Sequence, residues 1–96
     1  MNTNFKPEVF LSLDEQQTRT GSVFDYNFPI NTLVDPDGGV LTYSLMNYPQ
    51  WINFDPSTRR VYGLSGPDDI GTEQITIMAT DDTGGTGITS FTLEVL

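Results

Sequence analysis

Apolar residues recur at every second position along several short segments of this chain, and this period constrains the fold more than any other feature. The alternating triplets are Val9, Leu11 and Leu13; Phe24, Tyr26 and Phe28; Leu41, Tyr43 and Leu45; Ile75, Ile77 and Ala79; and Phe91, Leu93 and Val95. Successive side chains of a strand point to opposite faces of its sheet, so the pattern predicts strands with one buried face. No stretch of 10 residues free of Gly and Pro carries a helical apolar repeat, so we expect no substantial helix.

Turn-forming residues separate these segments. The breaks, where Asp, Asn, Gly and Pro gather, are 14–21, 35–39, 47–49, 55–58, 66–72 and 81–87. The strands that they leave are 8–13, 22–29, 40–46, 51–54, 60–64, 73–80 and 88–95. Seven short strands in 96 residues are typical of an all-β, antiparallel Greek-key sandwich of the immunoglobulin kind. We therefore expect a single domain over residues 1–96, with its core in about 8–96.

Composition narrows the chemistry available to this domain. The chain has 13 Asp and Glu against 4 Lys and Arg, a net charge of -9, and neither Cys nor His. This excludes disulfides, Cys and His zinc sites, cysteine nucleophiles and Ser-His-Asp triads. The acidic balance argues against nucleic acid and anionic membranes as partners, and no apolar run approaches the ~20 residues that span a bilayer. We expect no nucleic-acid partner and no direct insertion into a membrane.

Most carboxylates fall in the turns, and alternate turns of an antiparallel sandwich lie at the same end. One end is expected to hold Asp35, Asp37, Asp55, Asp81 and Asp82, and the other Asp14, Glu15, Asp68 and Asp69. Crowded carboxylates repel one another unless a cation or solvent screens them, and oxygen donors in flexible loops suit Ca²⁺ better than Mg²⁺. The segment 35–39 is also ordinary turn chemistry, in which Asp caps, Pro presets φ and Gly takes a positive φ. Both interpretations stay open.

Four segments taken together resemble a known family. They are 35–45 (DPDGGVLTYSL), 49–55 (PQWINFD), 58–63 (TRRVYG) and 75–84 (ITIMATDDTG). In this order they resemble the dystroglycan-type cadherin-like domain and the putative-Ig repeats of bacterial surface proteins, over about residues 8–96. The resemblance implies a cadherin-like sandwich that serves as one of several tandem repeats of a longer adhesion or surface protein. It implies an extracellular or cell-surface location, with neighbouring repeats, another surface protein or a polysaccharide as partners.

The resemblance also implies calcium ligands. Asp35, Asp37 and Asp81 match the family's Ca²⁺ positions at one end, with Asp82 and Asp55 as less certain additions. At the other end the nearest matches to a half-site shared with the next repeat are Asp14, Glu15, Asp68 and Asp69. There the chain departs from the family, because 67–71 reads PDDIG, so that half-site is expected to be incomplete.

Aromatic residues leave a second function open. Trp51, with Tyr48 and Tyr62, could form the platform on which a carbohydrate-binding module stacks a sugar ring, whereas the family pattern places Trp51 in the core. A glycosidase is disfavoured, because turn carboxylates lack the burial that raises the pKa of a general acid, and we expect no enzyme. A passive spacer whose acids confer solubility is the third possibility. We expect Arg59 and Arg60, the only basic cluster, to pair with nearby acids or to be solvated.

Overall fold

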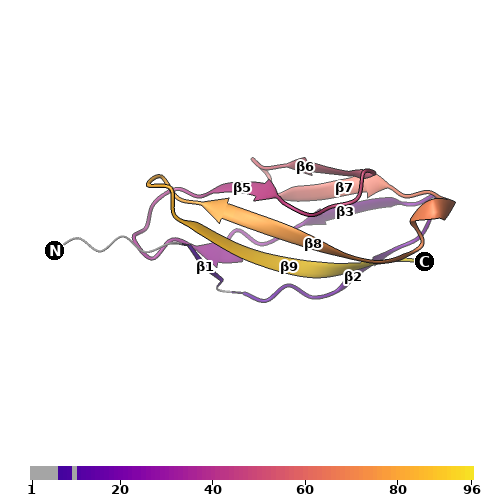
Figure 1. The fold of residues 1–96 in the computed structure, drawn as a ribbon, viewed down its shortest axis with the longest axis horizontal. Coiled ribbons are helices and arrows are strands. Elements are labelled where there is room, and N and C mark those ends of the chain that lie inside the picture. Colours follow the sequence, from indigo (N-terminus) through magenta and orange to yellow (C-terminus); the bar gives the residue numbers. More distant parts are fainter. Residues whose placement is uncertain (1–6, 10) are drawn as a thin grey trace.

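The computed structural model describes residues 7–9 and 11–96. In this part of the chain, strands and one short 3₁₀ helix form two facing sheets and a two-stranded ribbon (Figure 1). The strands run along the long axis of the molecule, and the β8–β9 turn and η1 lie at opposite ends of it. The all-β sandwich expected from the period of two is confirmed.

The larger sheet has the strand order β2-β9-β8-β5, and these strands are Gln16–Thr18, Thr86–Val95, Gly71–Thr80 and Thr42–Leu45. The smaller sheet has the order β3-β7-β6, with bounds Val23–Asn27, Arg60–Leu64 and Ile52–Asp55. The ribbon pairs β1 (Glu8–Val9) with β4 (Leu33–Val34), and the 3₁₀ helix η1 (Pro67–Asp69) precedes β8. We call the end with residues 35–40 and 81–85 the hairpin end, and the end with η1 and Leu96 the C-terminal end.

The core lies between the inward faces of the two sheets. Ile75, Ile77 and Leu93 of the long β8–β9 hairpin are fully buried, and Val61 of β7 is buried on the facing sheet. Their neighbours along each strand point outward, as the alternation predicts. Phe28 extends the core beyond β3, where its ring lies 5.5 Å from that of Tyr43 in an edge-on arrangement. Each buried side chain of this size contributes about 1.5–3 kcal/mol, so the two inner rows carry most of the stability.

Trp51 lies inside the sandwich rather than on a binding face. It is half-buried and packs against the core cluster, which confirms the core position that the sequence pattern gives it. Trp51 can pack here because residue 63 of β7 is a glycine. A Cβ on Gly63 would collide with the carbonyl oxygen of Trp51 and would lie 3.0 Å from the Trp51 ring.

The expected strand 8–13 is the main difference from the sequence analysis; its residue 10 lies outside the described residues. The structure has two short strands instead, β1 at Glu8–Val9 and β2 at Gln16–Thr18, and β2 lies in what was expected to be a turn. β2 pairs with β9 in parallel, with Gln16 opposite Leu93, so one pairing departs from the antiparallel expectation. The segment 16–18 has no apolar alternation, and its pairing is set by the open edge of β9 instead.

The other expected strands are confirmed with small shifts of their ends. β7 has the expected bounds, whereas β8 and β9 each begin two residues earlier than predicted. β4 was not expected, because two residues are too few to show a period. Within residues 7–9 and 11–96, no helix is long and apolar enough to cross a membrane.

Gly63→Ala is expected to lower the free energy of unfolding by about 1–3 kcal/mol, because the new methyl group must displace the Trp51 backbone. Gly66→Ala is the matched control, since a Cβ at Gly66 meets only the Asp69 carboxylate, at an ordinary 3.7 Å. Urea unfolding followed by Trp51 fluorescence measures both variants. Equal stability of the two would contradict the close packing of Trp51 under β7.

Candidate functional site

The turn between β4 and β5 is built by the carboxylate of Asp35. Its Oδ1 accepts a hydrogen bond from the backbone N–H of Asp37 (2.9 Å), and its Oδ2 accepts one from that of Gly39 (3.0 Å). Gly38 has a φ of 77°, which a residue with a side chain rarely adopts. The capping role proposed for Asp35 as turn chemistry is therefore present in the structure.

Asp81 does the same for the turn of the β8–β9 hairpin, but from a buried position. Only 6% of its surface is exposed. Its Oδ1 accepts hydrogen bonds from the Thr83 backbone N–H (3.0 Å), the Thr83 hydroxyl (2.8 Å) and the Gly85 backbone N–H (2.7 Å). Burial by itself raises the pKa of Asp81, but these hydrogen bonds outweigh it and leave the pKa below its ordinary value. The charged form is therefore the stable one.

The second oxygen of Asp81 has no partner. Oδ2 is buried and accepts no hydrogen bond within the described residues. A buried carboxylate oxygen without a donor is costly, so such an atom calls for a partner. It is the strongest local signal of a cation at this end.

The two turns meet above Gly39. A Cβ placed on this glycine would lie 2.6 Å from Asp35 Oδ2 and 3.3 Å from Asp82 Oδ1, so carboxylates from both turns approach the same point. Any side chain at position 39 would have to displace them. Two negative charges this close repel each other, which a bound cation would relieve.

The hairpin end thus collects Asp35, Asp81 and Asp82, three of the five acids expected there, with Asp37 in the same turn as Asp35. The donors are all oxygen and one of them is unpaired, which fits the chemistry of a hard cation such as Ca²⁺. No three acidic side chains within residues 7–9 and 11–96 are already arranged around one ion position, so backbone carbonyls or water would have to complete a ligand set.

Asp55 stands apart from this group. Its Oδ1 accepts hydrogen bonds from the backbone N–H (3.1 Å) and hydroxyl (2.7 Å) of Ser57. The Ser57 hydroxyl is the main cause that lowers the pKa of Asp55. Asp55 is therefore used in its own turn, between β6 and β7.

The acids of the other end are not gathered. Asp69 Oδ2 accepts a hydrogen bond from the backbone N–H of Gly66 (2.7 Å), which closes the turn of η1. Glu15 comes just before Gln16, which pairs with Leu93, whereas η1 lies beyond the pair of Gly71 and Val95. The strand register therefore separates Asp14 and Glu15 from Asp68 and Asp69 along the sheet.

Trp51 and Tyr62, two of the three aromatic residues proposed as a sugar platform, do not share a surface. Tyr62 points outward from β7, because its neighbour Gly63 points inward onto Trp51. The guanidinium of Arg60 lies 4.2 Å from the centre of the Tyr62 ring and covers it. Arg60 also forms two hydrogen bonds with Asp25, at 2.8 and 3.0 Å, so the expectation that this arginine pairs with an acid is confirmed.

Arg59 behaves differently from Arg60, although the sequence pattern gives both the same expectation. It has a φ of 57°, unusual for a residue with a side chain. Its Nε donates a hydrogen bond to the Phe28 carbonyl oxygen (3.1 Å), and its terminal nitrogens donate to no atom of the described residues. The doublet Arg59-Arg60 was the only signal in the sequence. Arg60 begins β7, whereas Arg59 is the last residue of the turn before it, so the two side chains have different surroundings.

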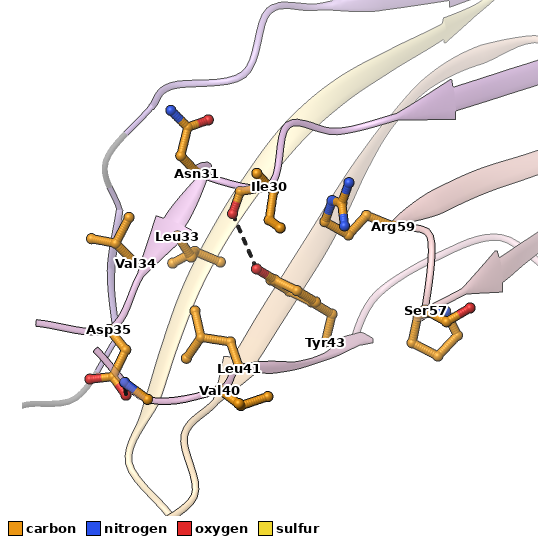
Figure 2. A pocket seen from close by; sticks show the side chains of 12 residues that line it. Ile30, Asn31, Leu33, Val34, Asp35, Val40, Leu41, Tyr43, Ser57 and Arg59 are labelled. Atoms are coloured by element: carbon orange, nitrogen blue, oxygen red, sulfur yellow. Dashed lines mark hydrogen bonds between the residues drawn. The ribbon is translucent and has the colours of Figure 1, made fainter. Parts of the chain in front are cut away.

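Arg59 borders a hollow of about 480 Å³ that opens between the turns of the two sheets (Figure 2). Ile30, Leu41 and Tyr43 form its wall, and the Tyr43 hydroxyl donates a weak hydrogen bond to the Ile30 carbonyl (3.4 Å). Desolvation raises the pKa of Tyr43, and the nearby positive charge of Arg59 partly offsets this rise. We call this feature the Arg59 hollow.

One protein family has a sequence model that matches this chain. The family is described as Putative Ig domain, and the match spans residues 7–96. No curated protein matches the chain closely enough to count as a relative.

Several solved structures share the fold. An endo-fucoidan hydrolase is 18% identical with a TM-score of 0.77, over 95% of this chain and 14% of its own. A putative alpha-galactosidase from Bacteroides fragilis is 14% identical with a TM-score of 0.70, over 97% of this chain and 18% of its own. The human Desmocollin-1 ectodomain is 15% identical with a TM-score of 0.62, over 100% of this chain and 20% of its own. The Ig- or cadherin-like fold is therefore confirmed, and the finer dystroglycan type stays a prediction.

Asp81→Asn is expected to make the free energy of unfolding fall less steeply as the pH is lowered. The pKa of Asp81 is lowered in the folded state, so its contribution is present above the unfolded pKa, about 4, and is lost as the pH falls through the folded pKa. Urea unfolding at pH 7, 4 and 2.5 should show a shallower loss in the variant, with a residual slope from Asp25 and Asp55, whose pKa values are also lowered.

Asp68→Asn is the control, because the Asp68 carboxylate accepts no hydrogen bond within the described residues. If Asp81→Asn left the pH dependence of the free energy of unfolding unchanged, the hydrogen bonds to Asp81 would not be stronger in its charged form.

Proposed function

Because this chain belongs to the Putative Ig domain family, we propose that it is a non-catalytic module of a larger extracellular protein. The observation that carries this proposal is the share of each similar chain that this chain covers. The match takes in nearly the whole chain, yet the chain spans only 14–20% of the three solved chains described above. A domain that recurs as a small part of large and unrelated proteins acts through its position among other domains.

We propose further that the hairpin end binds Ca²⁺. Three observations support this: the unpaired buried Oδ2 of Asp81, the approach of Asp35 and Asp82 above Gly39, and the absence of Cys and His from the chain. Asp35, Asp81 and Asp82 would hold the ion, and Asp37, in the same turn, is the further candidate. When bound, the ion supplies positive charge to this end. The chain's own part is to keep both turns closed, since the N–H groups of Asp37, Gly39, Thr83 and Gly85 already fix the carboxylates.

Calcium is expected to raise the melting temperature of the domain. For a Kd of roughly 1 mM, 10 mM Ca²⁺ adds about 1.4 kcal/mol by mass action, or about 5–10 °C for a domain of this size. Differential scanning fluorimetry would measure the shift, which should vanish in Asp81→Asn and Asp35→Asn.

Glu73→Gln is the matched control, since Glu73 is an exposed acid on β8, at the other end of that strand from Asp81. NaCl at equal ionic strength controls for screening. A shift of equal size in NaCl, or one that survives both Asp variants, would leave the passive spacer as the better description.

A second candidate is an accessory domain of a carbohydrate-active enzyme. The endo-fucoidan hydrolase and the alpha-galactosidase favour it, since each contains a domain of this fold within a much larger chain. In this role the domain would act as a spacer, because Trp51 faces the core and Tyr62 is covered by Arg60.

The spacer role predicts no direct contact between Trp51 and sugar. Its fluorescence should keep its wavelength and intensity when soluble polysaccharides, neutral or sulfated, are added at high concentration. A saturable shift that is lost in Tyr48→Ala would instead support the carbohydrate-binding function.

A further inference from the structure

The most exposed large apolar side chains of the described residues lie in two groups. Val40 is 78% exposed and Ile30 is 69% exposed, and both line the Arg59 hollow, on the hairpin side. Val23 is 67% exposed and Ile70 is 62% exposed, and both lie at the C-terminal end, Val23 opposite Leu64 and Ile70 directly after η1. Exposed apolar surface on a small soluble domain often marks a contact site.

The Arg59 hollow offers a fixed positive charge beside an apolar wall. The bond from Nε to the Phe28 carbonyl and the turn at Arg59 hold the guanidinium in place, which leaves the fork of terminal nitrogens for an outside acceptor. In a chain with 13 acids and 4 bases, an arginine without a carboxylate partner is unexpected. Asp35, at the far edge of the hollow, is occupied by the N–H groups of its own turn (Figure 2).

The segment 68–70 at the C-terminal end has the complementary chemistry. Asp68 is exposed and accepts no hydrogen bond within the described residues. Ile70 presents an exposed aliphatic side chain two residues later. Asp69, between them, accepts a hydrogen bond from the Gly66 backbone N–H with its carboxylate, which fixes the conformation of segment 68–70. A carboxylate next to an aliphatic group is what the Arg59 hollow can accept.

We propose that two copies of this chain associate head to tail, with segment 68–70 of one copy seated in the Arg59 hollow of the next. Asp68 would pair with Arg59, and Ile70 would cover Ile30 and Val40. Because β7 (Arg60–Leu64) runs between the Arg59 hollow and segment 68–70, one copy cannot satisfy its own sites, and the contact repeats from one copy to the next. Each copy has a net charge of -9, and the two copies repel each other. At 0.15 M salt the Debye length is about 8 Å, so the solvent screens the repulsion between charges that lie farther apart than this.

This association goes beyond the role proposed above and does not depend on calcium. Sedimentation equilibrium in EDTA and 0.15 M NaCl, from roughly 10 μM to 2 mM, should show an average mass that rises above the 10.7 kDa of the monomer. Arg59→Glu, Asp68→Arg and Ile70→Asp should each weaken the association by about tenfold or more. An equimolar mixture of Arg59→Glu and Asp68→Arg should associate again, since each supplies the surface that the other has lost.

The controls separate this contact from effects of net charge and folding. Arg59→Gln and Asn53→Asp change the charge by the same amount, but Asn53 lies on the outer face of β6, away from both surfaces. Arg59 also supports the Phe28 backbone, so Asp68→Arg and Ile70→Asp, which alter only exposed side chains, carry the test if the Arg59 variants unfold. A wild-type chain that stays at 10.7 kDa, equal weakening by Asn53→Asp, or a mixture that stays monomeric would overturn the proposal.

Discussion

The burial of two inner rows of apolar side chains against each other is the constraint on which the rest of the structure depends. The β8–β9 hairpin supplies one row through Ile75, Ile77 and Leu93, and the shorter sheet covers it with residues such as Val61. β8 and β9 have 10 residues each, whereas β6 and β7 have 4 and 5. The short sheet cannot cover the long hairpin along its whole length. The Arg59 hollow opens between the turn of the short sheet and the turn that leads into β5.

The carboxylates of the hairpin end close turns and, by the same arrangement, gather negative charge that a cation could bind. Asp35 and Asp81 close the turns of the hairpin end by accepting backbone N–H groups, and at Asp81 these hydrogen bonds lower the pKa and favour the charged form. The same arrangement brings negative charge close to a second carboxylate, Asp82, and leaves one oxygen of Asp81 buried without a partner. The turn and calcium interpretations of these residues are therefore compatible. A turn that orients its carboxylate with backbone donors still has oxygen lone pairs to offer a cation.

The two ends of the sandwich are where the module would meet other domains. The sides of the sheets carry paired side chains, such as Arg60 with Asp25 and Gln17 with Glu94. Arg59, on the hairpin side, and Asp68, at the C-terminal end, have no partner of opposite charge among the described residues, and exposed apolar residues lie beside each. A small domain built for a place in a longer assembly is expected to concentrate its interactions in this way, because its neighbours approach along the axis of the strands.

The sequence by itself determined most of the strands and turns, because both follow from neighbouring residues; the short strands β1, β2 and β4 are the exceptions. Alternation in 75–79 and 91–95 requires one buried face, and Asp, Pro and Gly in 35–39 close a turn whatever surrounds them. The tertiary structure alone decided which distant residues meet. Contacts across 12 to 77 residues of sequence decide four features. They are the parallel pairing of β2 with β9, the inward position of Trp51 under Gly63, the approach of Asp82 to Asp35, and the different partners of Arg59 and Arg60. No local pattern records such contacts, because they arise only when the two sheets pack.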